Sequence, residues 1–137
     1  MGSFLSLQGL TASYGGRGDV LSDISLDVAR GEVIGLIGPS GSGKSSLLRA
    51  LVGLLPPRAG RVSIAGAPVD YGSRASLRAA RDRFAIVFQQ YNLFGNMTAL
   101  RNVAVGPTLV KKRPPAEVEA EARALLAKVG LGEKLHA

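Results

Sequence analysis

The fold is decided by one stretch of sequence, Gly38-Pro39-Ser40-Gly41-Ser42-Gly43-Lys44-Ser45. It fits the phosphate-loop pattern Gly-x-x-x-x-Gly-Lys-Ser at every specified position. Glycines let the backbone curl so that N–H groups point at phosphate oxygens, and the following helix adds unpaired N–H groups and its positive dipole end. Lys44 supplies a positive charge for the β- and γ-phosphates, and Ser45 supplies a hydroxyl ligand for Mg²⁺. The stretch therefore predicts a site for ATP, or a closely related nucleotide, with Mg²⁺.

The flanking segments have the pattern that this motif requires. Residues 32–37 are almost continuously apolar, as expected of a strand covered on both faces. Residues 44–52 carry apolar side chains at helical spacing, namely Leu47, Leu48, Leu51 and Val52. The competing interpretation is a chance glycine-rich turn. With glycine at ~7% of residues on average, a chance match is on the order of one per cent, and the strand–loop–helix context makes it rarer.

Composition bounds the class of protein. The chain has 137 residues, 46% of them hydrophobic, which fits about one globular domain. The absence of cysteine excludes a disulfide framework, a cysteine nucleophile and a thiolate metal site. No apolar run approaches the ~18 residues needed to cross a bilayer, and the N-terminus lacks a secretory signal. We therefore expect a cytoplasmic protein that reaches a membrane only through a partner.

The net charge of +7 is a weak indication of an anionic partner. Its densest cluster, Lys111-Lys112-Arg113, lies directly before Pro114-Pro115 and is typical of a solvated loop. With four Phe, three Tyr and no Trp, an aromatic platform for single-stranded nucleic acid has little support. We expect no nucleic-acid partner.

Periodicity predicts further elements around the loop. Strands are expected over residues 3–14, 24–28, 61–65 and 84–88. Helices are expected over 44–52, 74–83, 99–104 and from Pro114 or Pro115 to Val129. The last helix is predicted to bury one apolar face, made of Val118, Ala122, Leu125, Leu126 and Val129.

Beyond the phosphate loop, two further stretches of the sequence resemble one family. The run that continues the loop with Ser46-Leu47-Leu48-Arg49, and Gly60-Arg61-Val62 after it, is similar to the nucleotide-binding subunit of ABC transporters. Residues 87–94 (VFQQYNLF), followed by residues 97–100 (MTAL) and Asn102-Val103, resemble the Q-loop region of that family. These motifs are most similar to those in the ATPase subunits of polar amino-acid importers. The resemblance covers essentially the whole chain.

The resemblance implies an α/β fold, a P-loop NTPase of ABC type. It implies an N-terminal antiparallel β subdomain, part of a parallel core sheet and the start of a helical subdomain, so that residues 1–137 form an incomplete domain. It places the nucleotide-binding core in residues 1–92 and the start of the helical subdomain in residues 93–137.

The resemblance also implies roles outside the loop. Tyr14 matches an aromatic residue that stacks on adenine, and Val20 matches its apolar neighbour. Gln89 matches a residue that contacts Mg²⁺ and the attacking water and relays nucleotide state to the membrane subunits. Catalytic roles thus fall to Lys44 and Gln89, and metal contacts to Ser45 and Gln89. Nucleotide contacts fall to Tyr14, Val20, Gly38, Pro39, Ser40, Gly41, Ser42, Gly43, Lys44, Ser45 and Ser46.

Each of these implied roles has a plainer alternative. Tyr14 could be an exposed aromatic residue in a turn, which without the family is as good an interpretation. Gln89 could be a polar residue that only ends a strand. The sequence departs from the family pattern at two places. It has Gly95-Asn96 where Pro-His is common and Arg101 where Glu is common. Both places lie in the segment that would face a membrane partner.

Three parts that the family needs for hydrolysis are missing from the sequence. There is no strand ending in Asp-Glu, no Leu-Ser-Gly-Gly-Gln-type signature, and the only histidine is His136. The resemblance implies that such parts follow in a longer subunit. We expect residues 1–137 alone to be poorly stable and nearly inactive as an ATPase.

The function that the resemblance implies is an ABC-type ATPase subunit that energises a membrane importer of amino acids or another small polar solute. Its partners would be transmembrane permease subunits and a second ATPase subunit, in a homodimer on the inner face of the plasma membrane. Two alternatives remain open: a soluble ABC-type ATPase acting on nucleic acid or ribosomes, and a nucleotide-binding module without turnover. The sequence does not name the transported solute.

Overall fold

The computed structural model describes residues 2–16 and 18–137. The chain divides into two compact units, Met1–Ile86 and Val87–Ala137. This division falls six residues before the boundary that the sequence placed after residue 92. In the part of the chain that the structure describes, no helix is both long and apolar enough to traverse a lipid bilayer.

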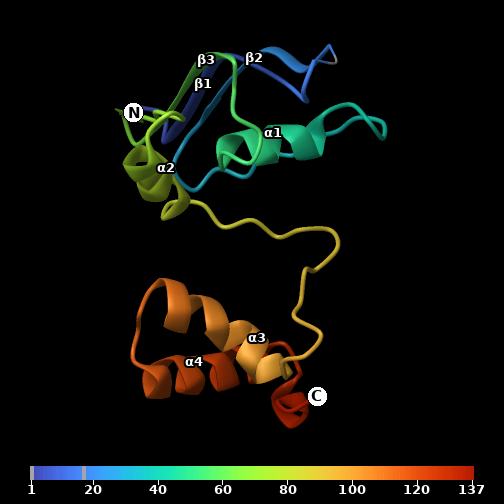
Figure 1. The fold of residues 1–137 in the computed structure, drawn as a ribbon, viewed down its shortest axis with the longest axis vertical. Coiled ribbons are helices and arrows are strands. Elements are labelled where there is room, and N and C mark those ends of the chain that lie inside the picture. The colour runs from blue at the N-terminus through green and yellow to red at the C-terminus, as the bar shows by residue number, and fades with distance from the viewer. Residues whose placement is uncertain (1, 17) are drawn as a thin grey trace. The chain divides into compact units, whose positions relative to one another are not determined.

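The first unit is built on a four-stranded antiparallel sheet (Figure 1). Its strands are β1 (Leu5–Ser13), β2 (Asp19–Val28), β3 (Ala59–Ile64) and β4 (Ala67–Pro68), in the order β2-β1-β3-β4. The central strand β1 pairs on both sides, so that Leu7 lies opposite Leu26 of β2 and Val62 of β3. The antiparallel β subdomain that the sequence predicted is confirmed.

Helix α1 (Lys44–Leu51) covers one face of this sheet. The core between them consists of Leu7, Leu10, Ala12, Leu21, Leu47, Ala50, Leu51, Leu55 and Val62, all of them buried. Leu48, which the sequence placed on the apolar stripe of the helix, is 45% exposed. The sheet and the helix therefore hold the glycine loop before Lys44 on a packed support.

The predicted strands at residues 32–37 and 84–88 are wrong for the described residues. Both segments are extended, but no strand of the described chain forms a ladder with either, and no parallel pair is present there. A strand needs a hydrogen-bonded neighbour as well as a suitable sequence, and apolar composition specifies only the second of these. The predicted partial parallel core sheet is therefore not formed by the residues described.

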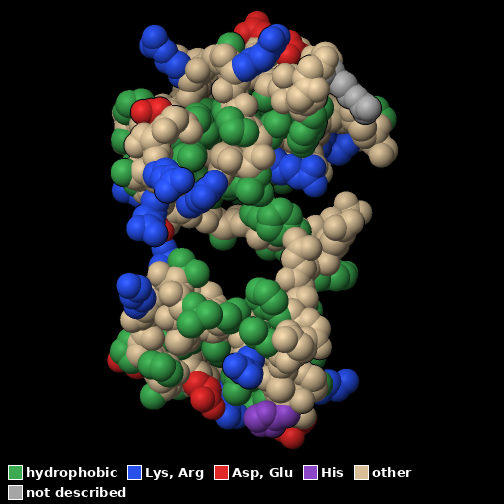
Figure 2. Space-filling view, in the orientation of Figure 1, with side chains coloured by type: hydrophobic (Ala, Val, Ile, Leu, Met, Phe, Trp, Pro, Cys, Tyr) green, Lys and Arg blue, Asp and Glu red, His purple; other side chains and the backbone are tan. Residues whose placement is uncertain are grey.

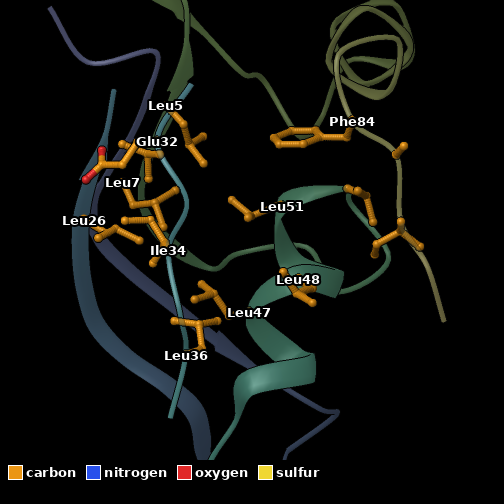
Figure 3. Close-up of a pocket in the computed structure, with 14 residues that line it drawn as sticks. Leu5, Leu7, Leu26, Glu32, Ile34, Leu36, Leu47, Leu48, Leu51 and Phe84 are labelled. Atoms are coloured by element: carbon orange, nitrogen blue, oxygen red, sulfur yellow. The ribbon is translucent and has the colours of Figure 1, made fainter. Parts of the chain in front are cut away.

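Residues 32–37 still alternate like a strand. Val33 and Ile37 are 93% and 99% exposed, whereas Ile34 and Leu36 turn the other way. They line an apolar cavity of about 280 Å³ between the sheet, α1 and residues 84–86 (Figure 3). Glu32 is the one acidic residue of its lining, and its carboxylate accepts the backbone N–H of Ala29 at 2.6 Å.

Helix α2 (Arg74–Arg81) follows β4 and is strongly basic. Its N-terminus is closed by Ser73, whose hydroxyl oxygen accepts the backbone N–H of Ser76 at 3.3 Å. Lys and Arg side chains gather where Figure 1 places this helix (Figure 2).

The second unit is helical. It contains α3 (Ala99–Val105), the π-helix η1 (Gly106–Val110), α4 (Pro115–Lys128) and the 3₁₀ helix η2 (Gly132–Lys134). The sequence predicted α3 and α4 but not η1. There the Lys111 N–H donates to the Gly106 carbonyl at 3.4 Å, a wider turn than that of an α-helix.

Helix α4 buries a narrower face than the sequence predicted. Val118, Ala122 and Leu126 are buried, but Leu125 is 48% exposed and Val129 is 69% exposed. The buried residues recur every four positions, and two of them pack with Leu100 of α3. The other two are exposed because this packing covers only one stripe of the helix.

The N-terminus of α3 is closed by the backbone carbonyls of Leu135 and Ala137. The backbone N–H of Ala99 donates to the carbonyl of Ala137 at 2.9 Å, and that of Leu100 donates to the carbonyl of Leu135 at 3.0 Å. The first two amides of this helix, which have no acceptor within it, are therefore satisfied by residues more than thirty positions away along the chain.

Two side chains complete this closure. The Thr98 hydroxyl accepts the backbone N–H of Arg101 at 3.2 Å. The Asn102 amide oxygen accepts the backbone N–H of Phe94 at 2.8 Å, and its nitrogen donates to the carbonyls of Phe94, Met97 and Thr98 at 3.0–3.2 Å. One amide side chain thus fixes the loop that enters α3.

Candidate functional site

The glycine loop leads into the N-terminus of α1, which is open. Gly43 is the N-cap residue, with φ 96°, and no side chain caps the helix. The backbone N–H of Leu47 donates to the Gly43 carbonyl at 2.9 Å. The amides before it, those of Lys44, Ser45 and Ser46, precede the first i→i−4 acceptor of the helix. Such an uncapped N-terminus favours an anion through both its N–H groups and its dipole.

One glycine of the loop leaves no room for a side chain. A Cβ atom on Gly43 would lie 2.9 Å from the Val20 backbone carbonyl oxygen, whereas one on Gly38 would lie 2.7 Å from the Ser42 hydroxyl oxygen, which can rotate away. Gly43 and Gly41 also have positive φ angles, which L-residues rarely adopt. The loop is therefore a cradle whose shape depends on glycine, as a phosphate site requires.

Lys44 folds its ammonium group back over this cradle. Its Nζ donates to the carbonyls of Gly38 and Pro39 at 2.7 and 2.8 Å and to the Ser42 hydroxyl at 3.2 Å. These contacts hold the curl of the loop and place a positive charge inside it. An ammonium group has three N–H donors, so a phosphate oxygen would replace a carbonyl rather than require a new arrangement.

Tyr14 lies against the first turns of α1. Its hydroxyl is 3.3 Å from the Ser46 Oγ, and Arg49 donates to it at 3.3 Å. Hydrogen bonding with Ser46, and then with Arg49, lowers the pKa of Tyr14 below its ordinary value. The structure thus brings together Tyr14, Val20 beside Gly43, and the phosphate loop, all of which the sequence assigned to one nucleotide site.

The two residues predicted to contact Mg²⁺, Ser45 and Gln89, are both exposed but belong to different units of the chain. Ser45, in the first turn of α1, is exposed, so its hydroxyl is accessible to a cation that bridges to a phosphate. Gln89 is exposed and belongs to the second unit, so the structure describes it separately from the loop. Its roles in contacting Mg²⁺ and water remain predictions.

Sequence reasoning gave no role to Arg49, although its position three residues after Ser46 puts both on one side of the helix.

The chemistry of the donor set fits a nucleotide with a divalent cation. Among the described residues, no group of three or more His, Cys, Asp or Glu side chains could form a protein cage for a metal ion. Mg²⁺ is commonly bound by one or two protein oxygens together with substrate phosphates. The Ser45 hydroxyl beside the anion cradle matches that mode.

Comparison with known proteins agrees with this geometry. The family model described as ABC transporter matches residues 21–137. The L-cystine transport system ATP-binding protein TcyN of Escherichia coli (strain K12) is 41% identical over 137 residues, which cover 96% of this chain and 54% of that protein. The glutamine transport ATP-binding protein GlnQ of the same strain is 45% identical over 121 residues, covering 88% of this chain and 50% of that protein.

A solved structure shares the fold. The dimeric post-hydrolysis state of the ATP-binding cassette MJ0796, bound to ADP and Pi, superposes with a TM-score of 0.82 at 32% identity, covering 96% of this chain and 60% of that one. The chain thus spans about half the length of the curated relatives named above. Since the family model matches most of its residues, the chain belongs to the ABC transporter family.

Proposed function

We propose that the phosphate loop of this chain binds ATP with Mg²⁺. The observation that carries the proposal is the combination of an uncapped helix N-terminus, an N-cap glycine (Gly43) without room for a Cβ, and the Lys44 ammonium held inside the loop. The names of TcyN and GlnQ describe ATP-binding proteins, and the MJ0796 structure contains ADP and Pi, which supports the same ligand class.

The residues of the site would have different roles in binding the nucleotide and in its hydrolysis. Backbone amides at the start of α1 and the Lys44 ammonium hold the phosphates and stabilise negative charge as the terminal phosphate leaves. Tyr14 and Val20 would contact the base, a role supported by the contact of Tyr14 with Ser46 and by the Val20 carbonyl beside Gly43. Ser45 and Gln89 would hold Mg²⁺, which neutralises phosphate charge when bound. Gln89 would also orient the attacking water through its amide.

For the intact protein we propose an ATPase subunit that energises an importer of amino acids or another small polar solute. The printed names of TcyN and GlnQ, which concern L-cystine and glutamine transport, support this solute class. Its partners would be transmembrane permease subunits and a second ATPase subunit, which would place it on the cytoplasmic face of the membrane. The dimeric MJ0796 structure supports the second subunit.

Two substitutions in the intact protein test the division of roles. Lys44→Ala should weaken Mg-ATP binding about ten- to hundredfold, because charge-assisted hydrogen bonds are lost. Gln89→Ala should leave binding nearly unchanged and slow phosphate release. Lys128→Ala, an exposed residue in the last turn of α4, is the matched control for loss of one charge. Wild-type ATP affinity in Lys44→Ala would refute the proposed site, and an undiminished rate in Gln89→Ala would refute only the role of Gln89.

A further inference from the structure

The hydroxyl of Tyr14 is attached to α1 at two points. Ser46 and Arg49 lie three residues apart on the helix and therefore on the same side of it. The Ser46 Oγ lies 3.3 Å from the Tyr14 hydroxyl oxygen, and the Arg49 guanidinium donates to that oxygen, also at 3.3 Å. The three side chains form a short row that runs from the first turn of α1 toward its middle.

Chemistry fixes the direction of one of these two bonds. A guanidinium has only N–H donors, so the Tyr14 oxygen must be the acceptor of the bond from Arg49. Between the Tyr14 and Ser46 hydroxyls, either oxygen can be the donor. Arg49 therefore holds the phenol oxygen against α1 whichever way the hydrogen of Tyr14 points.

The backbone around Tyr14 gives little other restraint. Tyr14 comes directly after β1 and is 43% exposed. Gly15 and Gly16 follow with φ angles of 41° and 76°, and a Cβ on either would meet no atom within 4 Å. A half-exposed ring beside two unobstructed glycines depends on contacts of its own side chain for a fixed position.

We infer that Arg49 is a positioning residue for the base of the bound nucleotide, acting through the Tyr14 hydroxyl. The inference rests on the proposed function, because the ring is useful only if a nucleotide occupies the loop. Arg49 holds the hydroxyl end of the ring against the side of α1 that carries Ser46, so that one ligand can reach the ring with its base and the loop with its phosphates. Binding therefore discriminates a nucleoside triphosphate from a bare polyphosphate.

The experiment compares two ligands on the intact protein: Mg-ATP and inorganic tripolyphosphate with Mg²⁺. Their dissociation constants are measured by calorimetry for the wild type, Arg49→Gln, Arg49→Lys and Tyr14→Phe. Arg49→Gln should weaken ATP binding about three- to tenfold, the value of one hydrogen bond. Tyr14→Phe also loses the contact with Ser46 and should weaken ATP binding at least as much. Tripolyphosphate binding should change less than about twofold, since this exposed arginine touches the ring and not the loop. Arg49→Lys keeps a charged donor on a longer side chain than that of glutamine, and should recover part of the ATP affinity.

Two further proteins separate positioning from general effects. Arg78→Gln removes an exposed helical arginine from α2 and calibrates the loss of one positive charge. The double variant Arg49→Gln/Tyr14→Phe should lose no more ATP affinity than Tyr14→Phe alone, because Tyr14→Phe already removes the bond from Arg49. Thermal unfolding of each variant checks that the fold is retained.

The outcomes distinguish this inference from the proposed function. If the wild type binds neither ligand, the proposed function fails. If the wild type prefers ATP and Arg49→Gln weakens both ligands equally, Arg49 acts as a general charge and the inference is overturned. It is also overturned if Tyr14→Phe binds ATP as the wild type does, or if the two single effects add in the double variant.

Discussion

Helices α1 and α3 begin in opposite ways. At α3 the first amides are taken by the carbonyls of Ala137 and Leu135, and the Thr98 hydroxyl accepts the next one. At α1 the N-cap is Gly43, which offers no side chain, and no other side chain caps the first turn. Both helices have the same backbone requirement. At α3 the protein satisfies it internally, whereas at α1 it is left for a ligand.

The two ends of α1 also differ in whether side chains bond to their free backbone groups. Near its C-terminus, the carbonyl of Leu51 accepts the Tyr71 hydroxyl at 3.3 Å, and the carbonyl of Val52 accepts the Arg81 Nε at 2.9 Å. The helix is thus closed by side chains at the end that rests against the rest of the unit and open only at the glycine loop. The N-terminus of α4, with Pro114 at the N-cap, also lacks a side-chain cap. The glycine loop before α1, and not the missing cap alone, therefore marks this helix end as a site for an anion.

The largest expected effect comes from adding one methyl group to the open end. Gly43→Ala places a Cβ 2.9 Å from the Val20 carbonyl in a left-handed conformation, so the loop must shift. We expect ATP affinity, measured by calorimetry on the intact protein, to fall at least about tenfold.

Gly66→Ala is the matched control for this change. Gly66 has a similar φ of 80°, but a Cβ there would meet nothing within 4 Å. That variant should lose about 1 kcal/mol of stability and keep its ATP affinity. Equal ATP affinities in the two variants would show that the open end of α1 does not bind the phosphates.

A smaller effect is expected at the closed end of α3. Asn102→Ala removes the side chain that bonds to Phe94, Met97 and Thr98 and should lower the free energy of unfolding by about 2 kcal/mol. Hydrogen exchange should quicken at the Phe94 amide, while ATP affinity stays the same. Asn102→Asp keeps the acceptor for that amide and loses the donors, so its exchange rate at Phe94 should lie between the two. A weaker affinity for ATP would contradict the separation of the two helix ends.

Thr98→Ala removes only the side-chain cap of α3. The expected loss of stability is about 1 kcal/mol, measured by urea unfolding of the intact protein. Thr98→Ser keeps the hydroxyl and should recover most of it. If serine were no better than alanine, the Arg101 amide would not depend on this hydroxyl.

The smallest effect concerns pH at the closed end of α1. Burial raises the pKa of Tyr71 to about 12, above its ordinary value near 10. The folded state favours the neutral phenol, so its contribution to stability is complete below pH 10 and is lost as the pH rises toward 12. The wild type should lose more stability than Tyr71→Phe between pH 9 and pH 11, by less than about 1 kcal/mol because the ring is only half-buried. Parallel unfolding curves for the two proteins would contradict this.

Much of the fold could be predicted because local patterns carry it. Helices α1, α2, α3 and α4 and the strands β1 and β3 occur where periodicity and turn residues placed them, within a few residues, whereas β2 begins at Asp19, five residues before the predicted strand. The phosphate loop was predicted because its glycines have a local steric reason, which Gly43 shows directly. Leu125 and Val129 were assigned to the core wrongly, since periodicity shows which residues share a face but not how much of that face is covered.

Long-range contacts could not be predicted from the sequence. Nothing in the sequence around Thr98 indicates that the carbonyls of Leu135 and Ala137 accept hydrogen bonds from the first two amides of α3. The bond from Arg49 to Tyr14 joins residues 35 positions apart and depends on how β1 lies beside α1. Strands at residues 32–37 and 84–88 were predicted from composition, but pairing depends on a neighbour that composition does not specify.

The extended segment at residues 32–37 has a practical consequence for handling the protein. Val33 and Ile37 are almost fully exposed, and no strand of the described chain pairs with the backbone between them. An apolar extended segment with open hydrogen-bonding edges is a template for adding a strand from another molecule. Residues 1–137 purified alone should therefore self-associate as their concentration rises, and the light scattering of a sample is a better first check of its quality than its ATPase rate.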